Sequence, residues 1–169
     1  MTTASLPAGL TIAPLTSYAD ARECAHLMAT SDPWITLGRG YEDSLRMVRD
    51  PTREVYVAKA QGELAGFLIL SMTGPFVGYV QTVCVHPDHQ RRGVGTVLVR
   101  FAEERIFRES PNVFLCVSTF NTDAQRLYER LGYSRVGEIT NFVVAGAGEI
   151  LLRKTLGPYS EFRATKRET

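Results

Sequence analysis

The chain has 169 residues, of which 44% are hydrophobic and 22% are charged. This composition is typical of a soluble globular domain and excludes a disordered, collagen-like or coiled-coil chain. With 19 basic and 18 acidic residues the net charge is +1, so no overall field attracts nucleic acid or an anionic membrane. Any site that binds phosphate must therefore be local.

The start of the sequence and its cysteines indicate the compartment. Residues 1–10 contain neither a basic segment nor a long apolar one, which predicts no signal peptide and a cytoplasmic location. Residues 64–87 carry no Asp, Glu, Lys or Arg, but polar residues interrupt them, and two strands joined at Gly74-Pro75 fit better than a membrane span. The three cysteines lie far apart in apolar patterns and are expected to be reduced core thiols, with no metal site: Cys24, Cys84 and Cys116.

The N-terminal part of the sequence predicts one strand followed by two helices. Residues 10–14 alternate between apolar and polar side chains, as a short strand does. Residues 17–30 have a helical pattern, and proline and glycine make residues 31–40 a loop. A second helix is expected over residues 41–49, because Asp50-Pro51 stops it.

The middle of the sequence predicts three strands and an amphipathic helix. Residues 53–60 alternate with β-branched and aromatic side chains, and Gln61-Gly62 turns the chain into a second strand over residues 63–73. A third strand is expected over residues 77–85. Residues 94–108 place apolar side chains at helical spacing, so this helix should pack on a sheet.

The last part of the sequence predicts a buried strand, a helix and a strand pair. Residues 113–117 form an uninterrupted apolar run, which indicates a central strand covered on both faces. Residues 122–131 begin with a capping-box pattern, and Gly132 suits the end of that helix. Strands are expected over residues 141–145 and 149–156, joined by Gly-Ala-Gly.

This order of elements predicts an α/β fold with a mixed, mainly antiparallel central sheet, one parallel strand pair and helices on both faces. The parallel pair comprises residues 77–85 and 113–117, and an open sheet commonly forms its ligand crevice at such a pair. We expect a single domain over residues 1–156. Residues 157–169 are expected to form a polar C-terminal appendage.

The turn between the third strand and its helix has the composition of a phosphate-binding segment. Residues 86–96 read HPDHQRRGVGT. Gly93 and Gly95 let an oxyanion approach backbone N–H groups at a helix start, where the macrodipole adds attraction. The segment lacks the third glycine of a dinucleotide fingerprint and the lysine of a P-loop. An ordinary glycine-rich turn is the alternative.

Two segments resemble motifs of a known family. Residues 83–95, VCVHPDHQRRGVG, are similar to the signature of the GNAT superfamily of acetyl-CoA-dependent N-acetyltransferases, and residues 121–133, NTDAQRLYERLGY, resemble its second motif. The resemblance covers residues 53–156 and extends through the early helices to about residue 10. It implies a GNAT-like fold whose parallel strands splay apart, acetyl-CoA as co-substrate and no metal.

The resemblance also implies a set of contacts with acetyl-CoA. Val83 and Val85 are expected to offer backbone groups to the pantetheine arm, and Asn121 is expected near the pantetheine or adenine. Core packing of the valines and a helix cap at Asn121 are the alternatives. The pyrophosphate would be held by the glycine-rich turn, through Arg91, Arg92, Gly93, Val94, Gly95 and Thr96.

Transfer to an amine needs a group that takes a proton, because a lysine-like ammonium is almost entirely charged at pH 7. Many relatives carry a carboxylate on the strand before the signature, but the matching residue here is Gln81, which cannot act as a base. The remaining candidates are Glu54, a water chain ending at a strand carbonyl, and an acceptor whose own pKa is low. We favour the water chain.

The resemblance assigns two further catalytic roles. Tyr128 matches the tyrosine that protonates the departing thiolate in relatives, and core packing is its alternative. A backbone N–H near Val83 is expected to meet the oxyanion of the tetrahedral intermediate.

Acceptor binding is expected from the segment over residues 31–49, which overhangs the sheet edge in the resembling fold. The candidate residues are Trp34, Arg39 and Tyr41, together with Gln81; a cap over the core is the alternative for Trp34. The resemblance implies an N-acetyltransferase acting on a primary amine of a small molecule or a peptide N-terminus. The protein is compatible with a homodimer, and neither nucleic acid nor a membrane is expected as a partner. A non-catalytic acyl-CoA-binding sensor or regulatory domain is the rival function.

Overall fold

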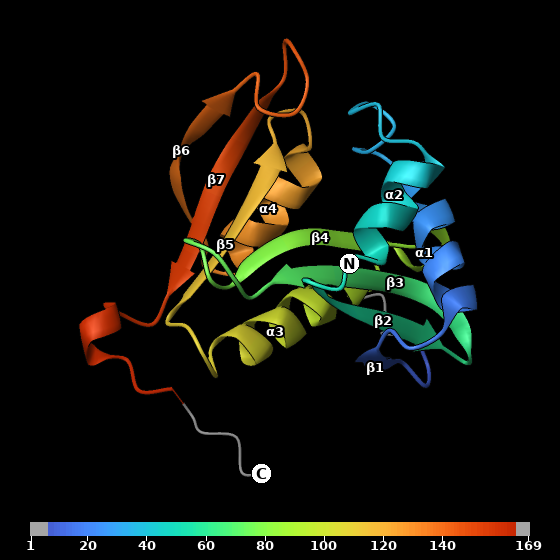
Figure 1. Ribbon diagram of the computed structural model, residues 1–169, viewed down its shortest axis with the longest axis horizontal. Helices are drawn as coiled ribbons and strands as arrows, with labels where there is room; N and C mark the ends of the chain where they lie inside the picture. The colour runs from blue at the N-terminus through green and yellow to red at the C-terminus, as the bar shows by residue number, and fades with distance from the viewer. Residues whose placement is uncertain (1–6, 165–169) are drawn as a thin grey trace. The chain divides into compact units, whose positions relative to one another are not determined.

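The computed structural model describes residues 7–164 (Figure 1). Its strands are Thr11–Pro14 (β1), Glu54–Ala60 (β2), Glu63–Ser71 (β3), Tyr79–Val85 (β4), Asn112–Ser118 (β5), Ser134–Thr140 (β6) and Gly148–Thr155 (β7). Its α-helices are Tyr18–Ala29 (α1), Tyr41–Val48 (α2), Val94–Ile106 (α3) and Thr122–Arg130 (α4), and its 3₁₀ helices are Pro87–His89 (η1) and Tyr159–Glu161 (η2). None of the helices in this part of the chain is long and apolar enough to cross a bilayer.

The strands form one sheet in the order β1-β2-β3-β4-β5-β7-β6. Among the described residues, β4 and β5 make the parallel pair, and their register joins Tyr79 to Phe114 and Val80 to Leu115. The other neighbours for which the structure gives a register run antiparallel. This confirms the predicted mixed α/β fold with one parallel strand pair, and the place of β5 between β4 and β7 confirms that it is central.

The chain forms two compact units that are described separately. Of the described residues, unit 1 comprises 7–70 and 82–100, and unit 2 comprises 71–81 and 101–164. Both β4 and α3 contribute residues to each unit. The boundary of the domain at residue 156 stays a prediction.

Helices cover both faces of the strands in unit 1. α1 buries Met28 in a core that contains Phe67 and Ile69 of β3. Leu98 of α3 approaches the opposite face, where it lies next to Gly66. Figure 1 shows α1 and α2 on one side of β2 and β3, with α3 on the other side. The amphipathic patterns of these helices therefore match the faces that they bury.

In unit 2, α3 and α4 cover one face of β5 and β7. Leu115 and Leu152 are register partners on this face, and both are buried. Lys154 points to the same side, where its Nζ donates to Glu103 Oε2 of α3 at 2.8 Å. The next residue of each strand points to the opposite face, because side chains alternate along a strand.

One predicted strand is wrong. Residues 141–145 belong to the connection between β6 and β7, and the strand that pairs with β7 is β6, over Ser134–Thr140. β6 lies at the edge of the sheet and its side chains are mostly exposed, so its sequence has no apolar alternation to reveal it. The connection turns at Asn141, which has a φ of +54° and accepts from the N–H of Gly146 at 2.8 Å.

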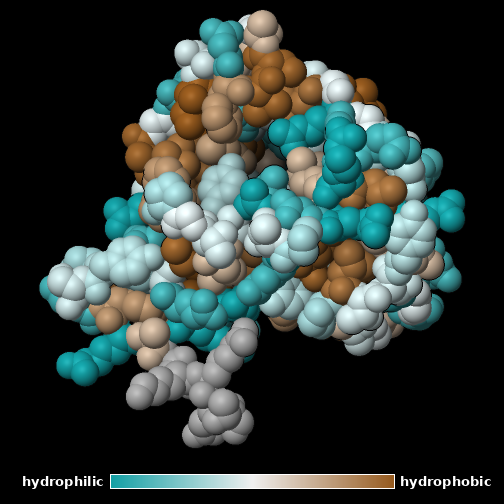
Figure 2. All heavy atoms as spheres, in the orientation of Figure 1, coloured by the Kyte–Doolittle hydropathy of each residue, from teal (hydrophilic) through white to brown (hydrophobic). Residues whose placement is uncertain are grey.

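The part of unit 2 that carries β6 has a hydrophobic surface. Val136 and Phe142 are more than half exposed, and Ile139 is 37% exposed. Figure 2 shows hydrophobic residues gathered over this region, at the upper left of the view. The apolar character of residues 142–145, which suggested a strand, thus belongs to an exposed loop.

Candidate active site

The predicted phosphate turn lies where β4 ends and α3 begins, within unit 1. Gly93 has a φ of +82°, a conformation that glycine adopts easily. The N–H of Val97 bonds to the carbonyl of Gly93 at 3.0 Å, whereas no described residue accepts from the N–H groups of Val94, Gly95 and Thr96. Three backbone donors at the positive end of a helix dipole, with no acceptor in the described part of the chain, suit an anion. The residues present therefore fit a phosphate-bearing ligand.

The valines of the GNAT-like signature lie on the less buried side of β4. Val83 and Val85 are half-buried, and they alternate with Thr82 and Cys84, which are buried. Cys84 belongs to the core under α1. The two valines therefore do not point into that core, and their roles toward a ligand stay predictions.

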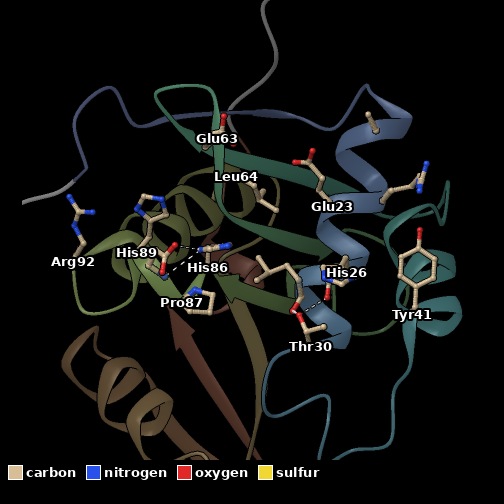
Figure 3. Close-up of a pocket in the computed structure, with 14 residues that line it drawn as sticks. Glu23, His26, Thr30, Tyr41, Glu63, Leu64, His86, Pro87, His89 and Arg92 are labelled. Carbon is tan, nitrogen blue, oxygen red and sulfur yellow. Dashed lines mark hydrogen bonds and ion pairs between the residues drawn. The ribbon is translucent and has the colours of Figure 1, made fainter.

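A cavity of about 990 Å³ opens beside the phosphate turn in unit 1 (Figure 3). Its wall includes all three histidines of the sequence, His26, His86 and His89. Tyr41, a predicted acceptor residue, and Arg92, a predicted pyrophosphate residue, line the same cavity, and Figure 3 shows them at its opposite ends. The described residues contain no group of His, Cys, Asp and Glu that could hold a metal ion.

Two other predicted acceptor residues make contacts within unit 1. Trp34 is 9% exposed and lies in the hydrophobic core with α1. Arg39 Nη1 lies 3.7 Å from Met47 Sδ of α2. Packing accounts for both positions, and their contact with an acceptor stays a prediction.

Glu54, the candidate base, and Gln81, which stands where many relatives carry a carboxylate, differ in their surroundings. Glu54 Oε2 accepts from the hydroxyl of Tyr56 at 2.8 Å. Its register partner is Leu70, which alternates with Ile69 of the core under α1, so Glu54 lies on the sheet face away from α1. Gln81 belongs to unit 2, and its Oε1 is buried with no hydrogen-bond partner among the described residues.

Tyr128 lies on α4 in unit 2, and it is 8% exposed. Burial raises the pKa of its phenol to about 12, so the group carries its proton at neutral pH. Asn121 precedes the same helix, and its Oδ1 accepts from the N–H of Ala124 at 3.2 Å. The cap expected as the alternative for Asn121 is confirmed, and its contact with a ligand stays a prediction.

The sequence analysis missed a polar cluster on β4, β5 and β7. Ser118 Oγ donates to Glu149 Oε1 at 2.6 Å, and Glu149 is only 6% exposed. The Tyr79 hydroxyl and the Cys116 thiol lie close enough to affect each other's pKa, and burial raises the pKa of the Cys116 thiol. Predicting this cluster requires the pairing register that joins Ser118 to Glu149, and the pattern of a single sequence does not contain that register.

The amino-acid sequence is similar to a known protein family and to individual acetyltransferases. Residues 17–133 match the acetyltransferase (GNAT) family. The N-alpha-acetyltransferase RimI of Mycobacterium tuberculosis is 34% identical over 156 residues, which cover 88% of this chain and 94% of that relative. The S-(2-succino)cysteine N-acetyltransferase of Bacillus subtilis is 33% identical over 92 residues, which cover 49% of this chain and 56% of that relative.

Solved structures share the fold. The ribosomal-protein-S18-alanine N-acetyltransferase from Escherichia coli has a TM-score of 0.71 at 21% identity, covering 90% of this chain and 97% of that one. An aminoglycoside 6'-N-acetyltransferase complexed with coenzyme A has a TM-score of 0.70 at 19% identity, covering 88% and 98%. The sequence match extends over most of the chain and of its relative. The chain therefore belongs to the acetyltransferase (GNAT) family and is an acetyltransferase.

Proposed function

We propose that the protein transfers an acetyl group from acetyl-CoA to a primary amine of a small molecule or a peptide N-terminus. One observation carries the proposal. In a chain of this family, three backbone N–H groups at the start of α3, directly after the left-handed turn at Gly93, have no acceptor among the described residues. Relatives named as N-alpha-acetyltransferases support a peptide N-terminus, and the relative named for S-(2-succino)cysteine supports a small amine.

Acetyl-CoA, the co-substrate, would supply an electrophilic thioester. The N–H groups of Val94, Gly95 and Thr96 would donate to its pyrophosphate, and Arg91 and Arg92 would add positive charge. Backbone groups of Val83 and Val85 would bind the pantetheine arm, and Asn121 would lie near the pantetheine or adenine.

The acceptor would be held by Trp34, Arg39, Tyr41 and Gln81. The buried Oε1 of Gln81 has no hydrogen-bond partner among the described residues, which supports this role. Burying an unpaired acceptor costs free energy, and a donating ammonium would remove that cost. The amine nitrogen would form a bond with the thioester carbon, and a backbone N–H near Val83 would stabilise the oxyanion. When the C–S bond breaks, Tyr128 would donate a proton to the thiolate.

Thermal denaturation with acetyl-CoA and a thiol-release assay test the proposal together. The amines would be a peptide with a free N-terminal alanine and blocked lysines, S-(2-succino)cysteine, and an aminoglycoside. We expect stabilisation by acetyl-CoA, thiol release with at least one amine, and a product heavier by one acetyl group. The same peptide with its N-terminus already acetylated is the control.

The outcomes separate the rival functions. Stabilisation without thiol release would favour the acyl-CoA-binding sensor. A melting temperature unchanged by saturating acetyl-CoA would contradict the proposed co-substrate. Thiol release with the acetylated control peptide would contradict amine transfer.

A further inference from the structure

The face of β5 and β7 opposite to α3 gathers polar side chains in unit 2. Register pairs Ser118 with Glu149, and Cys116 lies two residues before Ser118 on the same side of β5. Lys154 points to the other face, toward Glu103. Tyr79 joins the cluster from β4, where its hydroxyl interacts electrostatically with Cys116 and Glu149.

The cluster begins where the registered pairing of β4 with β5 ends. The last registered pair joins Val80 to Leu115, and Cys116 is the next residue of β5. Ligands of open sheets bind at the ends of such strands, beside a parallel pair. The cluster therefore occupies the part of unit 2 where a substrate is expected.

Glu149 is the group in this cluster that can take a proton. Its Oε1 accepts from Ser118, its Oε2 has no partner among the described residues, and no described lysine or arginine forms an ion pair with it. A buried carboxylate with one neutral donor is therefore incompletely satisfied. Such a group can accept a further hydrogen bond from an ammonium.

The neighbouring titratable groups cannot serve as the base. Burial raises the pKa of the Tyr79 phenol and of the Cys116 thiol, so both are protonated at neutral pH. On β6 the register partner of Glu149 is Ile139, and the adjacent Glu138 carboxylate is bonded to Arg135 at 2.7 Å.

We propose that Glu149 is the general base that accepts the proton of the acceptor ammonium, with Ser118 holding its carboxylate in position. The inference rests on the proposed acetyl transfer to an amine. The ammonium loses one proton to Glu149, and the neutral nitrogen forms the C–N bond. When the C–S bond breaks, Tyr128 gives its proton to the thiolate. The nitrogen loses a second proton, which returns to Tyr128. Glu149 releases its proton to solvent, and the products are the amide and free coenzyme A.

The test is the pH dependence of kcat/KM for the variant Glu149→Gln with the alanine-initiated peptide or whichever tested amine reacts. An α-amine has a pKa of about 7.7 to 8.0. In the wild-type protein, Glu149 removes the proton from the ammonium. Its kcat/KM should therefore be nearly independent of pH from about pH 6 to pH 8 with such an amine. The variant depends on amine that is already neutral, so its kcat/KM should rise about tenfold per pH unit below the pKa of the amine.

The expected loss in Glu149→Gln is about tenfold at pH 7, where only about a tenth of an α-amine is neutral, and it should shrink above pH 8.5. The shift in melting temperature caused by acetyl-CoA should be unchanged, which shows that the variant folds and binds. A loss of the same size at every pH, or no loss at all, would overturn the proposal.

Matched variants separate catalysis from structure. Glu138→Gln removes a more exposed carboxylate from the neighbouring strand and should leave kcat/KM unchanged. Glu149→Asp keeps the carboxylate and should restore part of the flat pH profile, whereas Ser118→Ala should lower kcat without producing the tenfold slope. If Glu54→Gln produces the slope and Glu149→Gln does not, the base is Glu54 and our assignment is wrong. Absence of turnover by the original protein contradicts the proposed function itself, before any variant is compared.

Discussion

The ring of Tyr133 lies edge-on against the ring of Tyr128, with centroids 5.6 Å apart and planes at 66°. Lys154 Nζ lies 5.8 Å from the centroid of the Tyr133 ring. These contacts hold the Tyr128 ring through its carbon atoms, and no described residue bonds to its hydroxyl. Loss of that hydroxyl therefore should not disturb the packing of unit 2.

Tyr128→Phe should lower kcat by about 10²- to 10⁴-fold, because it removes the proposed proton donor to the thiolate. The ring and its volume are kept, so the melting temperature and the stabilisation by acetyl-CoA should not change. Steady-state kinetics with a verified acceptor and thermal denaturation measure both quantities. The phenol pKa of about 12 also predicts that no loss of activity below pH 10 arises from Tyr128.

Tyr133→Phe is the matched control for this prediction. The Tyr133 hydroxyl is buried with no hydrogen-bond partner among the described residues, so its removal should cost little stability and no turnover. An unchanged kcat in Tyr128→Phe, with chemistry limiting the rate, would show that Tyr128 is a packing residue.

Gly95→Val should abolish the stabilisation by acetyl-CoA. At one hundred times its Kd, a ligand that binds only the folded state stabilises it by about 2.7 kcal/mol. The added side chain would occupy the place of the oxyanion next to the N–H groups at the start of α3. Thermal denaturation with and without acetyl-CoA measures the effect.

The control for Gly95→Val is Gly137→Val on β6. Apart from its chain neighbours, no described residue has an atom within 4 Å of a Cβ added at Gly137, and the φ of Gly137 is not positive. This control should keep the full stabilisation by acetyl-CoA. Equal stabilisation of both variants would remove Gly95 from the phosphate site.

The sequence predicted the elements whose amphipathic patterns match a buried face. The helix expected over residues 94–108 ends at Ile106, and the strand expected over residues 113–117 extends by one residue at each end. Both lie against the core, so their apolar spacing follows the helical or extended geometry. β6 has no such signal, because an edge strand with exposed side chains gains little from burial.

The residues of the candidate site likewise include some that the sequence predicts and some that it does not. The turn at Gly93 could be predicted, because glycines and arginines that are adjacent in sequence are also adjacent in space. Glu149 could not be predicted, because Ser118 lies 31 residues away and only the pairing of β5 with β7 joins them. Local patterns do not contain the register of strands that are distant in sequence.

Gly66→Ala should destabilise the protein by about 1 to 3 kcal/mol through overpacking. A Cβ added at Gly66 would lie 2.6 Å from the carbonyl oxygen of Cys84 and 3.3 Å from the Cα of Val85. Both atoms belong to the backbone of β4 and cannot move aside as a flexible side chain can. Urea denaturation should show the loss, whereas Gly137→Ala should change the unfolding free energy by less than about 0.5 kcal/mol. Equal stabilities of the two variants would contradict this close packing of β3 against β4.

Lys154 of β7 and Glu103 of α3 form an ion pair within unit 2. Nζ and Oε2 are 2.8 Å apart, and the carboxylate side chain is only 8% exposed. Lys154→Met should destabilise unit 2 by about 3 kcal/mol, because the carboxylate of Glu103 remains buried without its cation. Glu103→Leu in the same chain should recover most of that loss, since it removes the buried charge as well. Urea denaturation of both single variants and the double variant measures the coupling between them. Additive losses in the double variant would show that the pair contributes through packing of the two side chains and not through its charges.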